Sequence, residues 1–333
     1  MAIAAGNHRK HHESHSHTNQ FLLCADLILP YLTPIELAAV SLVSKPLRLL
    51  ASSITFSRSF DAARSLEQFP IPFINHHHHP YTFFVYTTSL LLPNHRLSRQ
   101  FWGFGNINFD WDYSLTDLWG LIGVGCGCEG ECGEDCECVE MGGGGDGVMM
   151  ECGMWCGCGG RECGRRVTRR GVAVRVRIEW DRRKGWGLVA GEALRAGQYV
   201  CEYAGELLTT EETRKRQQKY DELASTGRFS SALLVVREHL PSRKACFRIN
   251  IDATKIGNVA RFINHSCDGG NLSTILVHNS GSLLPRVCFF ASEDIKAGEE
   301  LSFSYGDARL KSDGLKCFCG SSCCHGTLPS ENT

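Results

Sequence analysis

The sequence predicts a mainly β chain with few helices, in which two cysteine-rich modules flank the β-rich part and a helical region precedes them. Three observations lead to this prediction. From residue 171 onward, short apolar runs alternate with glycine and asparagine turns. Nine of the 18 cysteines lie between residues 126 and 163, and four more lie between residues 317 and 324. Helical periodicity is confined to residues 21–53 and to one stretch that follows residue 209.

The composition narrows the class of protein. A formal net charge of -1 predicts no global field that would attract nucleic acid or a membrane surface. The polar, histidine-rich start lacks the apolar core of a signal peptide, and the apolar run "TFFVYTTSLLL" is too short to span a bilayer. We therefore expect a soluble intracellular protein without a membrane partner, in which clustered thiols bind metal more often than they form disulfides.

The N-terminal third divides into three segments by pattern. Residues 1–20 are predicted to form a disordered tail, and residues 21–65 a helical region in which Pro34 begins a helix and Thr33 caps it. Residues 66–121 are aromatic and punctuated by Pro, Asn and Gly, which indicates extended, wrapping segments. The four histidines at 76–79 could bind metal, although a solvated loop is the favoured interpretation.

The segment 126–163 has few apolar residues, so a metal must supply its folding energy. Structural zinc takes four ligands, and nine thiolates satisfy three zincs if three of the sulfurs each bridge two metals. The net charge of about -3 can be offset by Arg161, Arg165 and Arg166. An odd cysteine count argues against a disulfide knot. The predicted ligands are Cys126, Cys128, Cys132, Cys136, Cys138, Cys152, Cys156, Cys158 and Cys163.

The end of the chain, "KCFCGSSCCHG", holds a second set of thiols. Cys317 and Cys319 are followed by Cys323 and Cys324, which gives three ligands with one to spare. A tetrahedral site needs a fourth, and Cys267 is the best isolated candidate because "RFINHSC" is polar and loop-like. The remaining candidates lie in strand-like apolar runs and are predicted to be buried small side chains: Cys201, Cys246 and Cys288.

The β-rich part contains one clear helix. "VAVRVRIEW" alternates apolar and basic residues, as a half-exposed strand does. Further strands are predicted at "QYVCEYAG", "CFRINIDA", "STILVHN" and "PRVCFFAS". In the helix "TTEETRKRQQKYDELAS", Thr209 and Glu212 have the spacing of a capping box.

At "RFINHSC" and "ELSFSYGD" the chain resembles the SET-domain lysine methyltransferases, in particular the heterochromatin-type, Su(var)-related subgroup and its plant members. The resemblance implies a pre-SET triple-zinc cluster at 122–167, a SET catalytic domain at 170–306 and a post-SET zinc module at 313–329. It implies small sheets around a pseudoknot, in which the "NHSC" and "SYG" segments pack together. It further implies methyl transfer from S-adenosylmethionine to a histone tail, usually at its ninth-residue lysine, on chromatin in the nucleus.

The resemblance also assigns roles to single residues. It places the cofactor against the loop of Lys184, Gly185 and Trp186, and against Asn264 and His265. Tyr305 corresponds to the catalytic tyrosine and is also expected to contact the cofactor. Phe303 stands beside it, and Tyr203 corresponds to a wall of the lysine channel. The fourth zinc would be held by Cys267, Cys317, Cys319 and Cys324, with Cys323 as the spare thiol.

The chain departs from the family pattern in three respects. The segment between Tyr220 and Cys246 is short, and a tyrosine that often touches the cofactor there is not evident. "DGGN" follows Cys267 and is one residue longer than the usual segment, and Ser304 stands where the family commonly has aspartate. Acidic residues of the SET region are candidates to attract a basic peptide, although they could equally be solvated surface: Glu202, Glu206 and Asp268.

A second resemblance concerns residues 22–53, "LILPYLTPIELAAVSLVSKPLRLLAS", which are similar to an F-box, the motif that docks onto ubiquitin-ligase adaptors. The tryptophan that usually follows the lysine is absent. The alternative is a helical region that packs against the catalytic core. Two other functions stay open: a non-catalytic adaptor or chromatin-binding protein with a degenerate SET domain, and a methyltransferase for a non-histone protein. The presence of Tyr305, Asn264 and His265 argues against degeneration.

Overall fold

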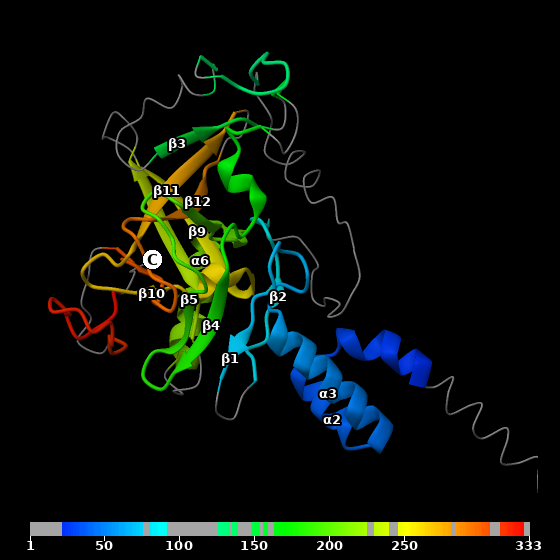
Figure 1. Ribbon diagram of the computed structural model, residues 1–333. Helices are drawn as coiled ribbons and strands as arrows, with labels where there is room; N and C mark the ends of the chain where they lie inside the picture. Colours follow the sequence, from blue (N-terminus) through cyan, green and yellow to red (C-terminus); the bar gives the residue numbers. More distant parts are fainter. Residues whose placement is uncertain are drawn as a thin grey trace, which may run out of the picture.

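The computed structural model shows a β-rich body with the helical region at one side (Figure 1). It describes residues 22–75, 80–91, 125–133, 135–136, 138, 148–153, 156–158, 163–224, 230–239, 246–280, 284–306 and 314–329. The prediction of a mainly β chain with few helices is confirmed. Within the described ranges, no helix has both the length and the apolar character needed to span a bilayer.

The helical region forms around local caps and a small core of its own. Residues 22–28 are helical, and η1 (Leu29–Tyr31), α2 (Pro34–Ser41) and α3 (Lys45–Phe60) follow. The Thr33 hydroxyl accepts from the backbone N–H of Glu36, whose carboxylate accepts from the N–H of Thr33 at 2.7 Å, so the predicted cap is a complete capping box. Leucines 29, 37 and 47 and Ile54 are buried between the helices.

A buried arginine joins the helical region to the extended segment that follows it. The Arg58 guanidinium donates to the carbonyl of Leu32 at 2.6 Å and to the hydroxyl of Tyr81 at 3.1 Å. The extended segment contributes β1 (Phe73–Ile74) and β2 (Val85–Tyr86). Residues 76–79 and 92–121 lie outside the described residues.

Three larger sheets and one two-stranded sheet make up the described part of the body. The first has the order β1-β4-β5, the second β3-β11-β12-β6, and the third β2-β9-β7 with β8 also paired to β9. β1 and β2 join the first and third sheets as parallel edge strands, so the extended segment belongs to the β-rich body. The remaining strands are β3 (Val148–Glu151), β4 (Val176–Asp181), β5 (Gly185–Ala190), β6 (Tyr199–Glu202), β7 (Gly205–Leu208), β8 (Leu233–His239), β9 (Cys246–Gly257), β11 (Leu272–Asn279) and β12 (Arg286–Ala291).

The predicted alternation in β4 is present: Val176 and Ile178 are buried, and Arg177 faces outward. The helix predicted after residue 209 is α6 (Thr210–Ala224), and the Thr209 hydroxyl accepts from the N–H of Glu212 at 3.2 Å. Two 3-10 helices also lie in the described part of the β-rich body, η3 (Val167–Arg170) and η4 (Val259–Phe262).

Two segments that are distant in sequence meet as β10 (Asn264–His265) and β13 (Ser302–Phe303), which pair in parallel. The chain between them forms β11 and β12. The long "DGGN" loop fits here because of its glycines: Gly270 has φ +72°, and a Cβ at this position would lie 2.3 Å from the carbonyl oxygen of Ser302. This pairing brings the "NHSC" and "SYG" segments together, as the resemblance implies.

The N-terminal cysteine cluster (the nine cysteines between 126 and 163) is fastened to the second sheet. β3 pairs in parallel with β11, and the Ser280 hydroxyl at the end of β11 donates to the Cys138 sulfur at 2.7 Å. Beside it, the Arg286 guanidinium donates to Glu151 at 2.9 Å and to Glu202 at 3.1 Å. A buried ion network therefore couples the cluster to strands that carry the candidate site.

This network corrects one prediction about substrate attraction. Glu202 is buried and paired with Arg286, and Glu206 is paired with Arg216 at 2.6 Å. Both carboxylates are held in ion pairs within the fold, so neither is a freely solvated group for a basic peptide to contact. Asp268 is held locally, because its carboxylate accepts from the Ser266 hydroxyl at 2.6 Å and from the N–H of Gly270, which lowers its pKa.

Candidate active site and metal centres

An aromatic row lies where β6, β12 and β13 meet. Its members are Tyr203, Phe289, Phe303 and Tyr305, whose successive ring centroids are 6.3, 4.7 and 5.0 Å apart. These spacings are those of interacting aromatic pairs, so the rings form one continuous wall. Sequence reasoning missed Phe289, because the run "RVCFFAS" indicates a buried strand without showing what its side chains face.

The two tyrosine hydroxyls of the row are fixed by backbone carbonyls. Tyr305 Oη donates to Ile263 O at 2.8 Å, and Tyr203 Oη donates to Ala232 O at 2.9 Å. Burial raises the pKa of both phenols, and the charge of Glu300 adds to the effect on Tyr305. Both hydroxyls therefore stay protonated, and because each proton is committed to a carbonyl, their lone pairs are free to accept from a ligand.

His265 connects Tyr305 to a cysteine. Its Nδ1 accepts from the backbone N–H of Tyr305 at 3.1 Å, and its Nε2 lies 3.3 Å from the sulfur of Cys267. Burial lowers the pKa of His265, which favours the neutral ring. With Nδ1 accepting, the ring proton belongs on Nε2, where it points at the sulfur.

The predicted cofactor loop follows the turn between β4 and β5. The Asp181 carboxylate accepts from the backbone N–H groups of Arg183 and Lys184, which shapes this turn. Beyond it, Asn264 Nδ2 lies 3.4 Å from the carbonyl oxygen of Trp186, so the loop and β10 adjoin. The predicted contacts Lys184, Gly185, Trp186, Asn264 and His265 therefore lie on neighbouring segments.

Glu300 is the second residue that sequence reasoning missed. Its carboxylate accepts from Lys184 Nζ at 2.6 Å with one oxygen and from Asn264 Nδ2 at 2.8 Å with the other. The Lys184 side chain is therefore engaged with Glu300. Ser304, which stands where the family commonly has aspartate, is exposed, so this departure does not disturb the packing of the site.

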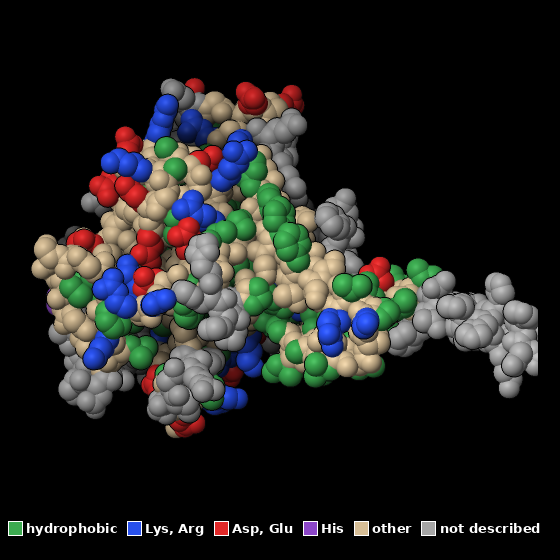
Figure 2. Space-filling model, turned by 60° about the horizontal axis from the view of Figure 1, so that its bottom comes forward, with side chains coloured by type: hydrophobic (Ala, Val, Ile, Leu, Met, Phe, Trp, Pro, Cys, Tyr) green, Lys and Arg blue, Asp and Glu red, His purple; other side chains and the backbone are tan. Residues whose placement is uncertain are grey.

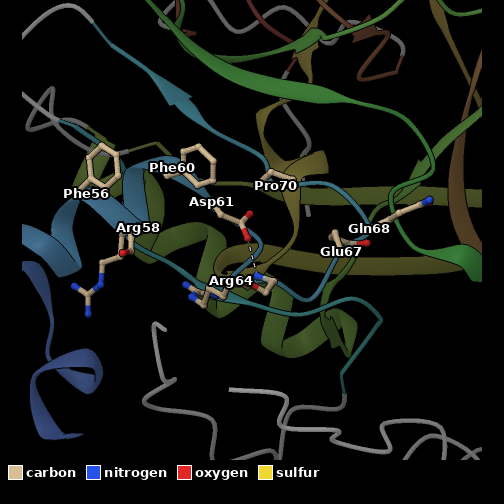
Figure 3. Close-up of a pocket in the computed structure, with 10 residues that line it drawn as sticks. Phe56, Arg58, Phe60, Asp61, Arg64, Glu67, Gln68 and Pro70 are labelled. Atoms are coloured by element: carbon tan, nitrogen blue, oxygen red, sulfur yellow. Dashed lines mark hydrogen bonds between the residues drawn. The ribbon is translucent and has the colours of Figure 1, made fainter. Parts of the chain in front are cut away.

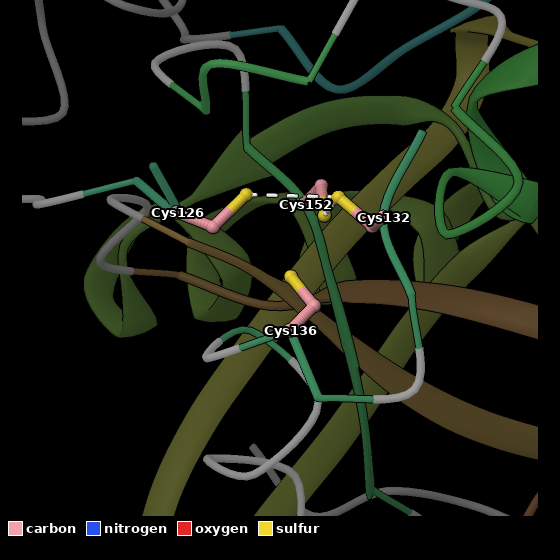
Figure 4. Close-up of side chains that lie close together, drawn as sticks. All are labelled: Cys126, Cys132, Cys136 and Cys152. Carbon is pink, nitrogen blue, oxygen red and sulfur yellow. Dashed lines mark hydrogen bonds between the residues drawn. The ribbon is translucent and has the colours of Figure 1, made fainter. Parts of the chain in front are cut away.

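The nine cysteines of the N-terminal cluster point their sulfurs at one another. Figure 4 shows four of them, Cys126, Cys132, Cys136 and Cys152, from separate turns of the chain. Three groups of four sulfurs, each within 4.8 Å of one another, overlap through shared members. Cys128 packs against the cluster, and Cys138 lies 3.6 Å from Cys156, sulfur to sulfur.

The spacing of these sulfurs fits zinc. Neighbouring sulfurs lie 3.5 to 3.7 Å apart. A zinc–sulfur bond of about 2.3 Å places tetrahedral ligands about 3.8 Å apart, whereas a disulfide needs about 2.05 Å. Overlapping groups are what bridging thiolates would produce. One of the arginines predicted to compensate the thiolate charge is in place: the buried Arg166 guanidinium lies 3.6 Å from the Cys158 sulfur.

A second four-sulfur group joins Cys267 to the end of the chain. The sulfurs of Cys267, Cys317, Cys319 and Cys324 all lie within 4.8 Å of one another, and Cys323 is exposed outside the group. Burial opposes ionisation of Cys319, but hydrogen bonds from the backbone of Cys267 and Ser321 lower the pKa of its thiol to about 6. The group therefore offers the thiolate that zinc prefers.

Comparison with known proteins agrees with this geometry. Residues 185–306 match the SET domain family. The chain is 53% identical to the histone-lysine N-methyltransferase SUVR3 of Arabidopsis thaliana, over 95% of this chain and 93% of that protein. The chain belongs to the SET-domain histone-lysine N-methyltransferases. Like this family, it is an enzyme of protein-lysine methylation.

Solved SET-domain structures of the Su(var) type resemble the fold. The crystal structure of Arabidopsis thaliana SUVH6 in complex with SAM has a TM-score of 0.63 and 28% identity, and the match covers 81% of this chain and 55% of that one. KRYPTONITE in complex with mCHH DNA, H3(1-15) peptide and SAH has a TM-score of 0.59 and 26% identity, with 81% and 53% covered. The chain thus spans about half the length of these two SET-domain proteins.

Proposed function

We propose that this chain transfers methyl groups from S-adenosylmethionine to the ninth-residue lysine of the histone H3 tail, in the nucleus on chromatin. The observation that carries the proposal is the aromatic row with two carbonyl-anchored tyrosine hydroxyls, Tyr203 and Tyr305, beside Asn264 and His265. Two solved relatives support it, one bound to SAM and one bound to an H3 peptide and SAH.

The row suits a lysine amine that must attack a carbon. An ammonium has no lone pair to donate, and the reference pKa of lysine is about 10.4. A channel that excludes water disfavours the charged form, as does the positive sulfonium of the donor, so the substrate lysine loses its proton more readily beside Phe289 and Phe303. The lone pairs of the Tyr203 and Tyr305 hydroxyls then accept from the amine N–H groups and aim its lone pair. S-adenosylmethionine supplies a methyl group on a sulfonium, which is a good electrophile.

The remaining residues are proposed to hold the donor and the fold. Lys184, Gly185 and Trp186, with Asn264 and His265, would form the donor site. The N-terminal cysteine cluster would hold three zincs, and the C-terminal group would hold a fourth. All four are structural, because cysteine ligands fill every coordination position. The domain boundaries proposed from the sequence, with the SET domain at 170–306, are retained.

The direct test is to incubate the protein with labelled S-adenosylmethionine and mixed core histones and then to map the label. Histone H3 should carry it, and an H3 in which this lysine is replaced by arginine should not. Label on another histone lysine would overturn the choice of residue. No transfer to any histone, with transfer to other nuclear proteins, would favour the non-histone alternative.

We predict that Phe303 permits more than one methyl group. Phe303 lies in the row between Phe289 and Tyr305, with 4% of its surface exposed. Phe303→Tyr adds a hydroxyl, and with it a bound water, where a methylated amine must rotate. The variant should keep the first transfer and shift products toward mono- and dimethyl forms by about tenfold, since 1.4 kcal/mol of discrimination suffices. Mass spectrometry of a lysine peptide decides it, and identical product distributions in the two proteins would contradict the prediction.

A second function is favoured by the surface of the helical region (residues 22–60). Of the sixteen large hydrophobic side chains that are exposed in the described residues, ten lie between 23 and 60, which is far more than single scattered cases. Figure 2 shows hydrophobic side chains gathered over this region. The helical region therefore has more apolar surface than its own small core uses.

The outer face of α3 concentrates this surface. Leu49, Phe56 and Phe60 follow the spacing of one helix face, and all are more than half exposed. Phe56 and Phe60 stack with centroids 6.3 Å apart and, together with Pro70, line a pocket of about 530 Å³ (Figure 3). We propose that this face docks onto a ubiquitin-ligase adaptor, as the F-box resemblance implies.

Docking is tested with a purified ubiquitin-ligase adaptor protein. Leu49→Asp and Phe56→Asp should each weaken binding at least tenfold, because a charge would enter an apolar contact, while methyl transfer continues. Leu223→Asp, which places the same charge on an exposed apolar position of α6, is the matched control. Absence of binding by the unaltered protein, or equal binding by all variants, would rule out the adaptor.

A further inference from the structure

The Glu300 side chain joins the cofactor loop to β10 by contacting a residue of each. One carboxylate oxygen accepts from Lys184 at 2.6 Å, and the other accepts from Asn264 at 2.8 Å. The two partners lie 116 and 36 residues away in sequence. The Glu300 backbone is itself fixed, because it bridges Val189 of β5 and the next residue, Leu301, donates to Leu188 O at 2.7 Å. The carboxylate therefore stands on a hydrogen-bonded backbone between the side chains of Lys184 and Asn264.

The carboxylate also determines which way the Asn264 amide faces. A carboxylate only accepts hydrogen bonds, so the amide must present its NH2 group to Glu300. The same nitrogen lies 3.4 Å from the carbonyl of Trp186, which is a second acceptor. Two acceptors on one side fix Nδ2 there and leave Oδ1 as the end that is available to accept from a ligand.

The backbone of the cofactor loop lies close to the side chains of Glu300 and Asn264 at Gly187. A Cβ on Gly187 would lie 2.8 Å from Glu300 Oε1 and 3.0 Å from Asn264 Nδ2. The first contact is too short for a Cβ and the second is tight, so a side chain at position 187 would displace the Glu300 carboxylate or the Asn264 amide. Lys184 compensates the charge of Glu300, with side chains that are 23% and 30% exposed. The pair therefore keeps the loop against β10 without leaving a net charge.

We propose that Glu300 is a positioning residue for the methyl donor. It holds the Asn264 amide with Oδ1 toward the donor site and ties the Lys184–Gly187 loop in place through Lys184. The donor's methionine end carries an ammonium, a group that an amide oxygen held in this orientation can accept from. The inference rests on the proposed use of S-adenosylmethionine, and it predicts a defect in donor binding that is separate from the handling of the peptide.

The experiment measures S-adenosylmethionine binding by calorimetry and KM for donor and for peptide separately. Glu300→Gln keeps the size of the side chain but can both donate and accept, so it no longer dictates the Asn264 orientation. It should weaken donor binding about tenfold and raise the donor KM similarly, with the peptide KM unchanged. Glu300→Asp, which keeps the charge, should recover part of the affinity. Glu293→Gln, an exposed carboxylate on the same strand-to-strand connection, is the matched control.

A double-variant measurement separates positioning from general stability. Because Lys184 acts through the same carboxylate, Lys184→Met alone should weaken donor binding. Combined with Glu300→Gln, it should cause little further loss of donor affinity. Donor affinity within twofold of the unaltered protein in Glu300→Gln would overturn the inference. So would equal losses of donor binding, peptide binding and melting temperature, which indicate a merely structural role. Failure of the unaltered protein to bind S-adenosylmethionine would instead refute the proposed function.

Discussion

Replacing Tyr305 with phenylalanine is expected to reduce methyl transfer at least a hundredfold, which corresponds to about 2.7 kcal/mol in the barrier. The change removes the hydroxyl that donates to Ile263 O at 2.8 Å and whose lone pairs face the site. Without it, the amine has lost one of its two orienting acceptors, and the other, on Tyr203, cannot fix a direction alone. The ring itself remains, so its contacts with Phe303 and His265 are kept.

The matched control is Tyr199→Phe. Tyr199 is equally a buried tyrosine, but its hydroxyl finds no hydrogen-bond partner in the part of the chain that the structure describes. Its removal deletes the same atom from a different place and should leave the transfer rate unchanged. Initial rates with a lysine peptide are the measurement, with circular dichroism as the check on folding. Transfer by Tyr305→Phe at the unaltered rate would show that the role proposed for Tyr305 is wrong.

Features that depend on neighbours in sequence could be predicted. The cap of α2 needs only Thr33 and Glu36, three residues apart, and both hydrogen bonds are formed. The cysteine spacing likewise favours a metal site, because an odd number of thiols this close together does not suit a disulfide framework. The sulfurs meet in overlapping groups of four, as that reasoning requires.

Features that depend on distant partners could not be predicted. "GEELS" gives no sign that one of its glutamates joins Lys184 to Asn264, since only the tertiary fold brings these residues together. Glu202 was expected to be accessible because carboxylates usually are, yet Arg286, 84 residues away, neutralises it in the interior. Charge and burial are thus properties of pairs of residues, and sequence reasoning assigned them one residue at a time.

The second large effect is expected from Cys324→Ser, which should remove one of four zincs and most of the activity. A serine hydroxyl is a poor zinc ligand at neutral pH, so the group of Cys267, Cys317 and Cys319 would lose its fourth donor. Loss of this zinc should affect the active site, because two contacts connect the ligand Cys267 to Tyr305. Cys267 lies 3.3 Å from the His265 ring, whose Nδ1 accepts from the N–H of Tyr305 at 3.1 Å. Without the metal, the Cys267 sulfur would lose the bond that holds it beside the His265 ring.

Cys323→Ser is the control that makes this prediction sharp. Cys323 is the neighbouring residue and the same chemical type, but its thiol is exposed and contacts the Ser321 hydroxyl at 3.1 Å rather than the sulfur group. The variant should keep all four zincs and the transfer rate of the unaltered protein. Metal analysis of both purified variants, together with initial rates, is the measurement. If Cys323→Ser loses the metal and Cys324→Ser retains it, the ligand has been assigned to the wrong cysteine; two or fewer zincs in the unaltered, folded protein would refute the proposed triple-zinc cluster as well.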